Sequence, residues 1–223
     1  MRPVAVEVPA GATETVALPD GSRVVLNSAS SLTYRRDLPL LGWDRRVRID
    51  GEAFFEVASR EEAFVVTTFN ARAKVLGTRF NVRARREGEI PATTVTLAAG
   101  ALRLFGEEGA RQPVTLAPGQ QSRVSGGGGV PAVPEPADLS VALAWRTGGL
   151  AFPSASLGTI FSELERRFAV EIQASPALRH DSLSLYLPEV SGAAAALEDL
   201  CAVQGCRYRR KSSSRFTIEP ASP

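Results

Sequence analysis

Residues 46–57 read Arg-Val-Arg-Ile-Asp-Gly-Glu-Ala-Phe-Phe-Glu-Val, and this stretch decides the fold class of the first half of the chain. Every second position, from Val47 to Val57, is apolar or glycine, whereas the positions between them are mostly charged. A period of two residues is typical of a β-strand that buries one face. Gly51 lies in the middle of the stretch, where a glycine commonly marks a bend or a bulge. The pattern therefore predicts a bent, half-buried strand.

Short alternating segments continue on both sides of this strand, from residue 15 to residue 124. The apolar phase switches between Val75 and Phe80, across Gly77, which predicts a bulge or a tight corner. Residues 95–104 and 114–124 each predict a pair of strands joined at a glycine turn. About ten short strands with almost no helical periodicity predict an all-β sandwich or a barrel-like sheet.

The composition changes at residues 126–137, where four glycines precede a proline-rich run. Such a run is typical of a linker between domains. Beyond it the apolar period becomes helical twice, with short strands between and after the helices, in the order β-α-β-β-α-β-β. We therefore expect a chain that is mainly β with a second, small α+β domain. The expected limits are an all-β domain at 1–125, a linker at 126–137 and the α+β domain at 138–223.

Charge and composition exclude several classes of function. The chain has 26 Lys and Arg against 24 Asp and Glu, a net charge of +2, which gives no support for a nucleic-acid binder. No apolar run approaches the roughly 18 residues that cross a bilayer. One histidine and two cysteines are too few for most zinc sites. The glycines at 126–129 are followed by prolines, not by the Lys-Ser or Lys-Thr of a phosphate loop. We expect no metal and no cofactor.

Two catalytic arrangements and one binding function are alternatives that the residues allow. Asp50 and Glu52 would lie about 6.6 Å apart on one strand face, a separation that fits a glycosidase. The same alternation is ordinary for the solvated face of an antiparallel sheet, which we favour. His180 lies in a loop, where a solvated side chain is the ordinary case. A carbohydrate-binding β-sandwich is an alternative, but the chain offers only two Trp and three Tyr for stacking on sugars.

Two features of the C-terminal part leave alternatives open. Cys201 continues the apolar face of the second helix, which Ser191 is expected to cap and Gly205 to end. Cys201 and Cys206 are either two small buried apolar side chains or a disulfide, which requires Cα atoms within about 7 Å. A basic cluster follows, and it is either a solvated strand edge or a patch for an acidic partner. Its members are Arg207, Arg209, Arg210 and Lys211.

Longer motifs occur along nearly the whole chain. They are LPDGSRVVLN (18–27), SSLTY (30–34), GEAFFEVA (51–58), VLGTRFNV (75–82), LAPGQQ (116–121), and AWR with GLAF (144–152). In content and order this set resembles the FecR family of anti-sigma regulators. The part after the linker is similar to the short N-terminal domain of secretins and TonB-dependent receptors.

The resemblance implies a function without catalysis. FecR-family regulators cross the inner membrane once and hold an extracytoplasmic-function sigma factor through a cytoplasmic segment. Their periplasmic part senses the signalling domain of a TonB-dependent outer-membrane transducer. This chain would be the periplasmic part alone, because it lacks the cytoplasmic segment and the membrane helix of the full pattern. We therefore expect transducer contact, and neither sigma binding nor membrane contact by these residues.

The motif residues have mainly structural explanations, and Asn81 is expected to satisfy a buried backbone group. The motif set is Gly51, Glu52, Phe55, Gly77, Phe80, Asn81, Gly119 and Trp145. The partner interface is expected in the small domain, where an exposed strand edge can accept a strand from the transducer. The candidates are the two C-terminal strands with their basic cluster, and the strand at 183–187 with Leu183 and Leu185.

Overall fold

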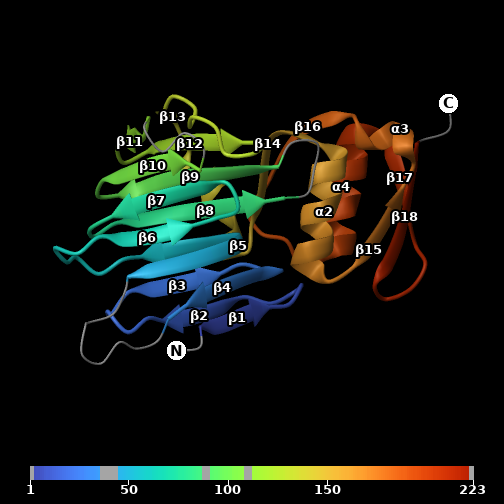
Figure 1. The fold of residues 1–223 in the computed structure, drawn as a ribbon. Helices are drawn as coiled ribbons and strands as arrows, with labels where there is room; N and C mark the ends of the chain where they lie inside the picture. Colours follow the sequence, from blue (N-terminus) through green and yellow to red (C-terminus); the bar gives the residue numbers. More distant parts are fainter. Residues whose placement is uncertain (1–2, 36–44, 87–90, 108–111, 221–223) are drawn as a thin grey trace. The chain divides into compact units, whose positions relative to one another are not determined.

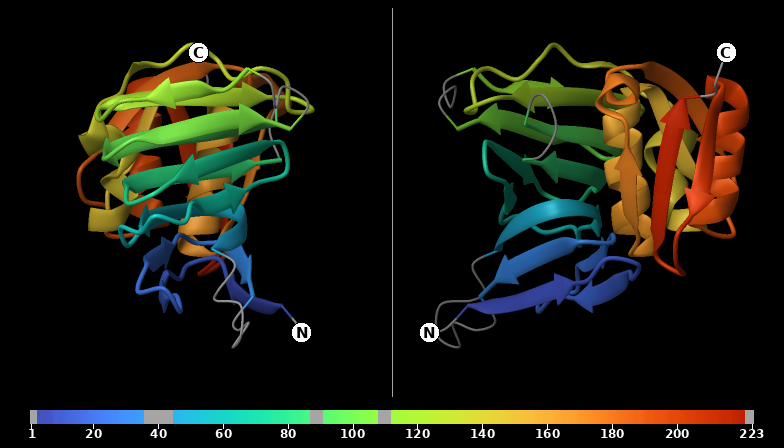
Figure 2. Two further views of the ribbon diagram at one scale, coloured as in Figure 1. Left: turned by 60° about the vertical axis from the view of Figure 1, so that its left-hand side comes forward. Right: turned by 90° about the vertical axis from the view of Figure 1, so that its right-hand side faces the viewer.

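A computed structural model describes residues 3–35, 45–86, 91–107 and 112–220, and in it the stretch at 46–57 forms strand β5 (Arg46–Glu56) (Figure 1). β5 lies in the first of two compact units, Met1–Leu139 and Ser140–Pro223. The first unit is built from strands, and the second combines helices with two small sheets (Figure 2). The predicted fold class, mainly β with a second α+β part, is confirmed.

β5 belongs to two sheet layers at once. Its first half pairs with β4 and β6, and its second half pairs with β3 and β8. Layer A contains, besides β5, β1 (Val4–Val8), β4 (Ser30–Tyr34), β6 (Phe64–Thr67), β7 (Ala71–Val75), β10 (Leu102–Gly106) and β11 (Val114–Leu116). Layer B contains, besides β5, β2 (Glu14–Ala17), β3 (Arg23–Leu26), β8 (Arg79–Arg85), β9 (Ala92–Ala99), β12 (Gln120–Ser125) and β13 (Glu135–Pro136).

The bend of β5 occurs at Gly51, as the sequence predicts. Gly51 has φ +105°, a conformation that side-chain-bearing residues rarely adopt. A Cβ atom at this position would lie 2.4 Å from Oγ of Ser30 on the neighbouring strand β4. Glycine is therefore required both by the backbone conformation and by the close approach of β4.

The core of the first unit lies between the two layers and is apolar. Phe55 and Phe80 are fully buried and stack with ring centroids 5.1 Å apart, while Phe64 meets Phe55 edge-on at 6.3 Å. Offset stacks and edge-to-face contacts are the favoured geometries of aromatic pairs. The Phe55–Phe80 stack lies within layer B, where the two residues are cross-strand partners, and the contact of Phe55 with Phe64 of β6 joins this stack to layer A.

The sequence predicts that residues 95–104 and residues 114–124 each form a pair of neighbouring strands, and both predictions are wrong. β9 pairs with β8 and β12 in layer B, whereas β10 pairs with β7 and β11 in layer A. β11 and β12 are likewise in different layers. The glycine between the segments makes a corner at which the chain passes from one layer to the other. Strict alternation predicts a strand but does not say which neighbour it pairs with. The corner predicted at Gly77 is of the same kind, between β7 and β8, and is confirmed.

Several residues of 126–137 form backbone hydrogen bonds with the first unit. The backbone of Ala132 donates to Arg123 O at 2.8 Å, and Ala137 donates to Gly119 O at 2.8 Å. β13 pairs with β12. A Cβ on Gly106 would lie 1.7 Å from the carbonyl oxygen of Gly129. Within the segment, Gly128 is closely packed, since a Cβ there would lie 2.7 Å from Asn70 O, whereas nothing lies within 4 Å of an added Cβ at Gly126 or Gly129.

The second unit has the predicted order β-α-β-β-α-β-β, preceded by α1 (Leu139–Ala142) and the 3-10 helix η1 (Ala144–Thr147). Its long helices α2 and α4 share one apolar core with both small sheets. One sheet is β14–β16, and the other has the order β15–β18–β17. The elements are β14 (Leu150–Ser156), α2 (Leu157–Phe168), β15 (Glu171–Ala174), α3 (Pro176–Arg179), β16 (Ser182–Leu187), α4 (Ala193–Gln204), β17 (Cys206–Arg210) and β18 (Arg215–Pro220).

The ends of the two long helices are set locally. Ser156 caps α2, because its Oγ accepts a hydrogen bond from Thr159 N at 3.3 Å. The prediction that Ser191 caps α4 is wrong. The N-cap position is Gly192, which has no side chain to accept a hydrogen bond. Gly205 ends α4 in the left-handed conformation, as predicted.

Candidate functional site

The strand edges of the second unit are the first candidate for a partner site. Within the described residues, β17 pairs only with β18, and β16 pairs only with β14. Each therefore presents one side of its backbone as an edge. β18 lies between β15 and β17, so of the two C-terminal strands that the sequence proposes, only β17 can accept a further strand.

The basic residues of β17 divide between its two faces. Arg207 and Arg209 alternate with Cys206 and Tyr208, which belong to the core side. Arg210 pairs with the buried Phe216, and its guanidinium donates to the carbonyls of Ser212 and Ser213 at 3.0 and 3.4 Å. Arg207 and Arg209 thus share one exposed face, while Arg210 supports the turn to β18.

Carboxylates from other strands reduce the charge of this face. Arg207 lies opposite Glu219, and the parallel pairing of β15 with β18 brings Glu171 to Arg215 at 2.8 Å. The side-chain amide of Gln173, followed by the Arg215 guanidinium, holds the pKa of Glu171 below its ordinary value. The sequence shows only Glu219 near the basic cluster, because Glu171 is 44 residues distant from Arg215.

The predicted contact residues of β16 face inward. Leu183 and Leu185 are half-buried and pack against the core of the second unit. Ser184 and Tyr186 point the other way, and Tyr186 is 53% exposed. A partner at this edge would meet the β16 backbone and Tyr186, whereas the two leucines hold the strand in place.

Cys201 and Cys206 form a disulfide in the structure, with their Cα atoms 4.5 Å apart. The bond joins the last turn of α4 to the first residue of β17. It therefore anchors one end of the candidate edge strand to the core. Disulfides of this kind persist in oxidising compartments.

Three FecR-like motifs meet at one buried carboxylate in the first unit. Asn27 Nδ2 and Asn81 Nδ2 each donate to the carboxylate of Glu52, both at 2.9 Å. The Glu52 backbone N–H donates to Ser30 Oγ, and Asn27 N donates to Glu52 O. Asn81 was expected to satisfy a backbone group, but this amide bond is to a side chain. Glu52 is 6% exposed, so the face predicted to be solvated is buried here.

The remaining motif residues are structural in placement. Gly119 lies in the turn between β11 and β12, and its N–H donates to Leu97 O. Trp145 lies in η1, is buried, and its carbonyl oxygen accepts a bond from Arg167 Nη1 at 3.3 Å. Partial burial lowers the pKa of Arg167.

The catalytic alternatives find no support in the geometry. Asp50 is half-exposed and pairs with Arg86 at 3.1 Å, whereas Glu52 is buried beyond the bend at Gly51. The two carboxylates therefore do not share an open face, as a glycosidase pair must. His180 is exposed at the end of α3. Among the described residues, no three His, Cys, Asp or Glu side chains lie close enough to hold a metal ion.

A buried ion pair was missed by sequence reasoning. Arg45 Nε donates to Asp20 Oδ2 at 2.8 Å, and both side chains are almost fully buried. The Arg45 guanidinium also donates to the carbonyls of Ala58 and Glu62, and Asp20 accepts two bonds from Ser22. The only sequence signal was Asp20 itself, in the turn of the LPDGS motif.

Comparisons with known proteins agree with this architecture. The family model described as FecR protein matches residues 4–103. Two crystal structures of a putative anti-sigma factor from Parabacteroides distasonis ATCC 8503 are similar to the chain. One is 29% identical, covers 99% of this chain and 100% of its own, and has a TM-score of 0.86. The other is 28% identical, covers 98% and 100%, and has a TM-score of 0.84. No curated protein sequence matches.

The class defined by this fold is therefore a regulatory protein with a two-layer β unit and a small α+β unit. Residues 4–103 match the FecR family model, and the resemblance to the FecR family is confirmed. FecR proteins are a regulatory family, not an enzyme family. No helix among the described residues is both long and apolar enough to span a bilayer.

Proposed function

We propose that this chain is the periplasmic sensor region of a FecR-type anti-sigma regulator. It receives its signal by contact with the signalling domain of a TonB-dependent outer-membrane transducer. It controls an extracytoplasmic-function sigma factor through a cytoplasmic segment that is not among these residues. The observation that carries the proposal is the similarity, over 99% of the chain, to an anti-sigma factor structure together with the FecR match.

The periplasmic assignment is supported by the cysteines. Cys201 and Cys206, which are the only two cysteines of the chain, form a disulfide with each other. A structural disulfide is ordinary in the periplasm and rare in the bacterial cytosol.

The transducer contact is proposed at the edge of β17. β17 is a short edge strand fixed at one end by the disulfide, and it carries Arg207 and Arg209 on one exposed face. Strand addition takes its affinity from backbone hydrogen bonds and its specificity from alternate side chains. An acidic strand of the transducer would meet the two arginines, which would guide its approach. β16, with Tyr186, is the second candidate edge.

The proposal is tested by calorimetry between the full chain and purified transducer signalling domains encoded in the same genome. We expect micromolar or tighter binding to one of them. The variant R207Q/R209Q should weaken that binding by about tenfold, because two charges at the contact are lost. The matched control R23Q/R79Q removes two exposed arginines from layer B and should bind as the parent does.

Two outcomes would count against the proposal. If R207Q/R209Q binds the transducer as tightly as the parent, the contact is not at β17, and a charged substitution at Tyr186 then tests β16. If no signalling domain binds the folded full chain, the transducer contact itself is wrong.

A further inference from the structure

The outer face of layer A carries a concentration of positive charge that the family motifs do not explain. Outward-facing positions on β5, β7 and β10 hold five cations: Arg46, Arg48, Arg72, Lys74 and Arg103. The nearest carboxylate on the same face of β5, Asp50, is paired with Arg86. The whole chain has a net charge of only +2, so this face is locally far more basic than the protein.

Strand register places these cations in two rows across the sheet. One row is Arg46, Val65, Lys74 and Arg103, and the other is Arg48, Thr67, Arg72 and Phe105. Neighbouring strands lie about 4.8 Å apart, and the rows lie about 6.6 Å apart along the strands. The charges therefore form a ladder about 14 Å long, which is longer than a single small anion can span.

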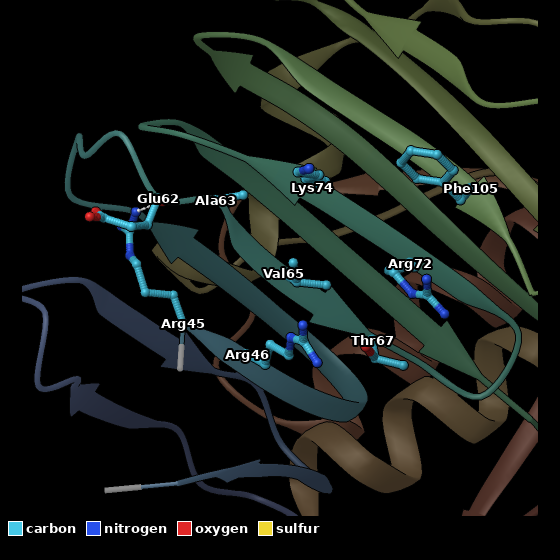
Figure 3. A pocket seen from close by; sticks show the side chains of 9 residues that line it. All are labelled: Arg45, Arg46, Glu62, Ala63, Val65, Thr67, Arg72, Lys74 and Phe105. Atoms are coloured by element: carbon cyan, nitrogen blue, oxygen red, sulfur yellow. Dashed lines mark hydrogen bonds between the residues drawn. The ribbon is translucent and has the colours of Figure 1, made fainter. Parts of the chain in front are cut away.

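A groove of about 640 Å³ follows this ladder (Figure 3). Four of its nine lining residues are basic, and Glu62 is the one carboxylate among them. The Arg45 guanidinium is already engaged by Asp20 and two backbone carbonyls, so it forms a wall of the groove. Arg46, Arg72 and Lys74 supply the charge on the face that Figure 3 shows.

The groove also offers apolar surface and a hydroxyl. Phe105 and Val65 line it beside Thr67, and the Arg103 guanidinium lies over one face of the Phe105 ring, 5.3 Å from its centroid, which leaves the other face for a ligand. An aromatic face accepts the C–H face of a sugar ring, while arginine and threonine bond its carboxylate and hydroxyl groups. Clefts of this volume with a few placed polar groups are typical of ligand sites.

The backbone beneath the groove cannot accept a peptide strand. Each of β5, β6, β7 and β10 is paired on both sides within layer A. A partner must therefore be recognised by side chains alone. The cores of protein interfaces are rich in large aromatic residues, whereas Phe105 is the one aromatic residue that lines this groove.

We infer that this groove binds a linear anionic polysaccharide. The recognised groups are sugar-borne carboxylates or sulfates at the cation ladder, with one sugar ring on Phe105. The inference is independent of the transducer contact, which lies in the other unit. It gives the FecR domain a ligand of its own.

The test is calorimetry of the full chain with polygalacturonate, dextran sulfate, neutral dextran and polyglutamate of similar length. We expect a charged glycan to bind, with an affinity that falls as salt rises, and dextran not to bind. A preference between polygalacturonate and dextran sulfate identifies the anionic group. The variant R72Q/K74Q should weaken binding by about tenfold or more. R23Q/R79Q removes the same number of charges elsewhere in the unit and should have no effect.

Phe105→Leu separates a glycan from an acidic protein segment. This substitution should weaken the binding of the charged glycan severalfold and leave any binding of polyglutamate unchanged. Melting curves show whether each variant is folded. The inference is overturned if no charged glycan binds, or if R23Q/R79Q weakens binding as much as R72Q/K74Q. It is also overturned if polyglutamate binds as tightly as the glycans and Phe105→Leu has no effect, which would assign the groove to an acidic protein.

Discussion

At the scale of single residues, the first unit depends on a carboxylate that is buried but fully provided with donors. Glu52 takes one amide from Asn27 and one from Asn81, and these three residues come from three separate motifs. Hydrogen bonds to a buried charge contribute more than neutral ones, and losing one leaves a costly unpaired group. The three motifs therefore act together, because each supplies one member of this cluster.

Glu52→Gln should lower the free energy of unfolding by about 1–3 kcal/mol. The new amide keeps one acceptor oxygen but turns an N–H group toward an asparagine N–H group. Chemical denaturation of the full chain measures the change. Asp50→Asn is the control, because it makes the same kind of replacement two residues away at a half-exposed position, and about 0.5 kcal/mol or less is expected there. Equal effects from the two variants would contradict the role assigned to Glu52.

The identity of these motif residues could be predicted from the sequence, but their meeting could not. Gly51, Phe55 and Phe80 have the structural roles that periodicity and the family resemblance predict. Asn27 was noticed only as part of a motif, because its bond to Glu52 spans 25 residues. Side-chain bonds of this kind depend on strand order, which periodicity does not provide.

At the scale of elements, β5 is a strand whose function depends on its bend. Each half has its own neighbours, and the change of layer takes place within one residue. Sequence alternation predicted the length of β5 to within one residue and the buried face of its first half, whereas both faces are buried from Gly51 to Phe55. It could not predict the parallel pairing with β6, nor the separation of β9 from β10, because both depend on how the chain crosses between layers.

Gly51→Ala should destabilise the protein by about 2–5 kcal/mol, from backbone strain together with the clash with Ser30. Gly21→Ala is the matched control, since Gly21 has φ +86° but nothing within 4 Å of an added Cβ. It should cost about 1–2 kcal/mol from strain alone. Thermal and urea unfolding measure both, and the same loss for each variant would show that the approach of β4 does not matter.

Breaking the Cys201–Cys206 bond should lower the stability of the second unit by about 2 kcal/mol, the value for a short closed loop. The measurement is thermal unfolding of the parent with and without reductant. A Cys201→Ala/Cys206→Ala variant should be insensitive to reductant. A parent protein that melts at the same temperature in both conditions would contradict the expectation.

At the scale of the whole molecule, the remaining question is where the first domain ends. Composition predicts a linker at 126–137, yet Asn70 Nδ2 donates to the carbonyls of Val124 and Gly126, and Ser122 Oγ donates to Ala132 O. We propose that 126–137 folds with the first domain and that 138–223 is the second domain. Glycine and proline content predicts a boundary nearby but cannot distinguish a mobile segment from a packed one.

A fragment of residues 1–139 should be more stable than a fragment of residues 1–125, by about 2–4 kcal/mol for the hydrogen bonds that the shorter one loses. Circular dichroism melts of the two purified fragments measure the difference. Identical melting temperatures would show that residues 126–137 do not stabilise the first domain and act only as a linker.

Because β5 belongs to both layers, it also determines how the first unit unfolds. In a sandwich of two separate sheets, one sheet can fray while the other survives. Here one strand, β5, lies between β4 and β6 in layer A and between β3 and β8 in layer B. Opening either layer removes a central strand from its partner, so the unit has no stable half. We therefore expect the first unit to unfold in one cooperative step, without a state in which only one layer is intact.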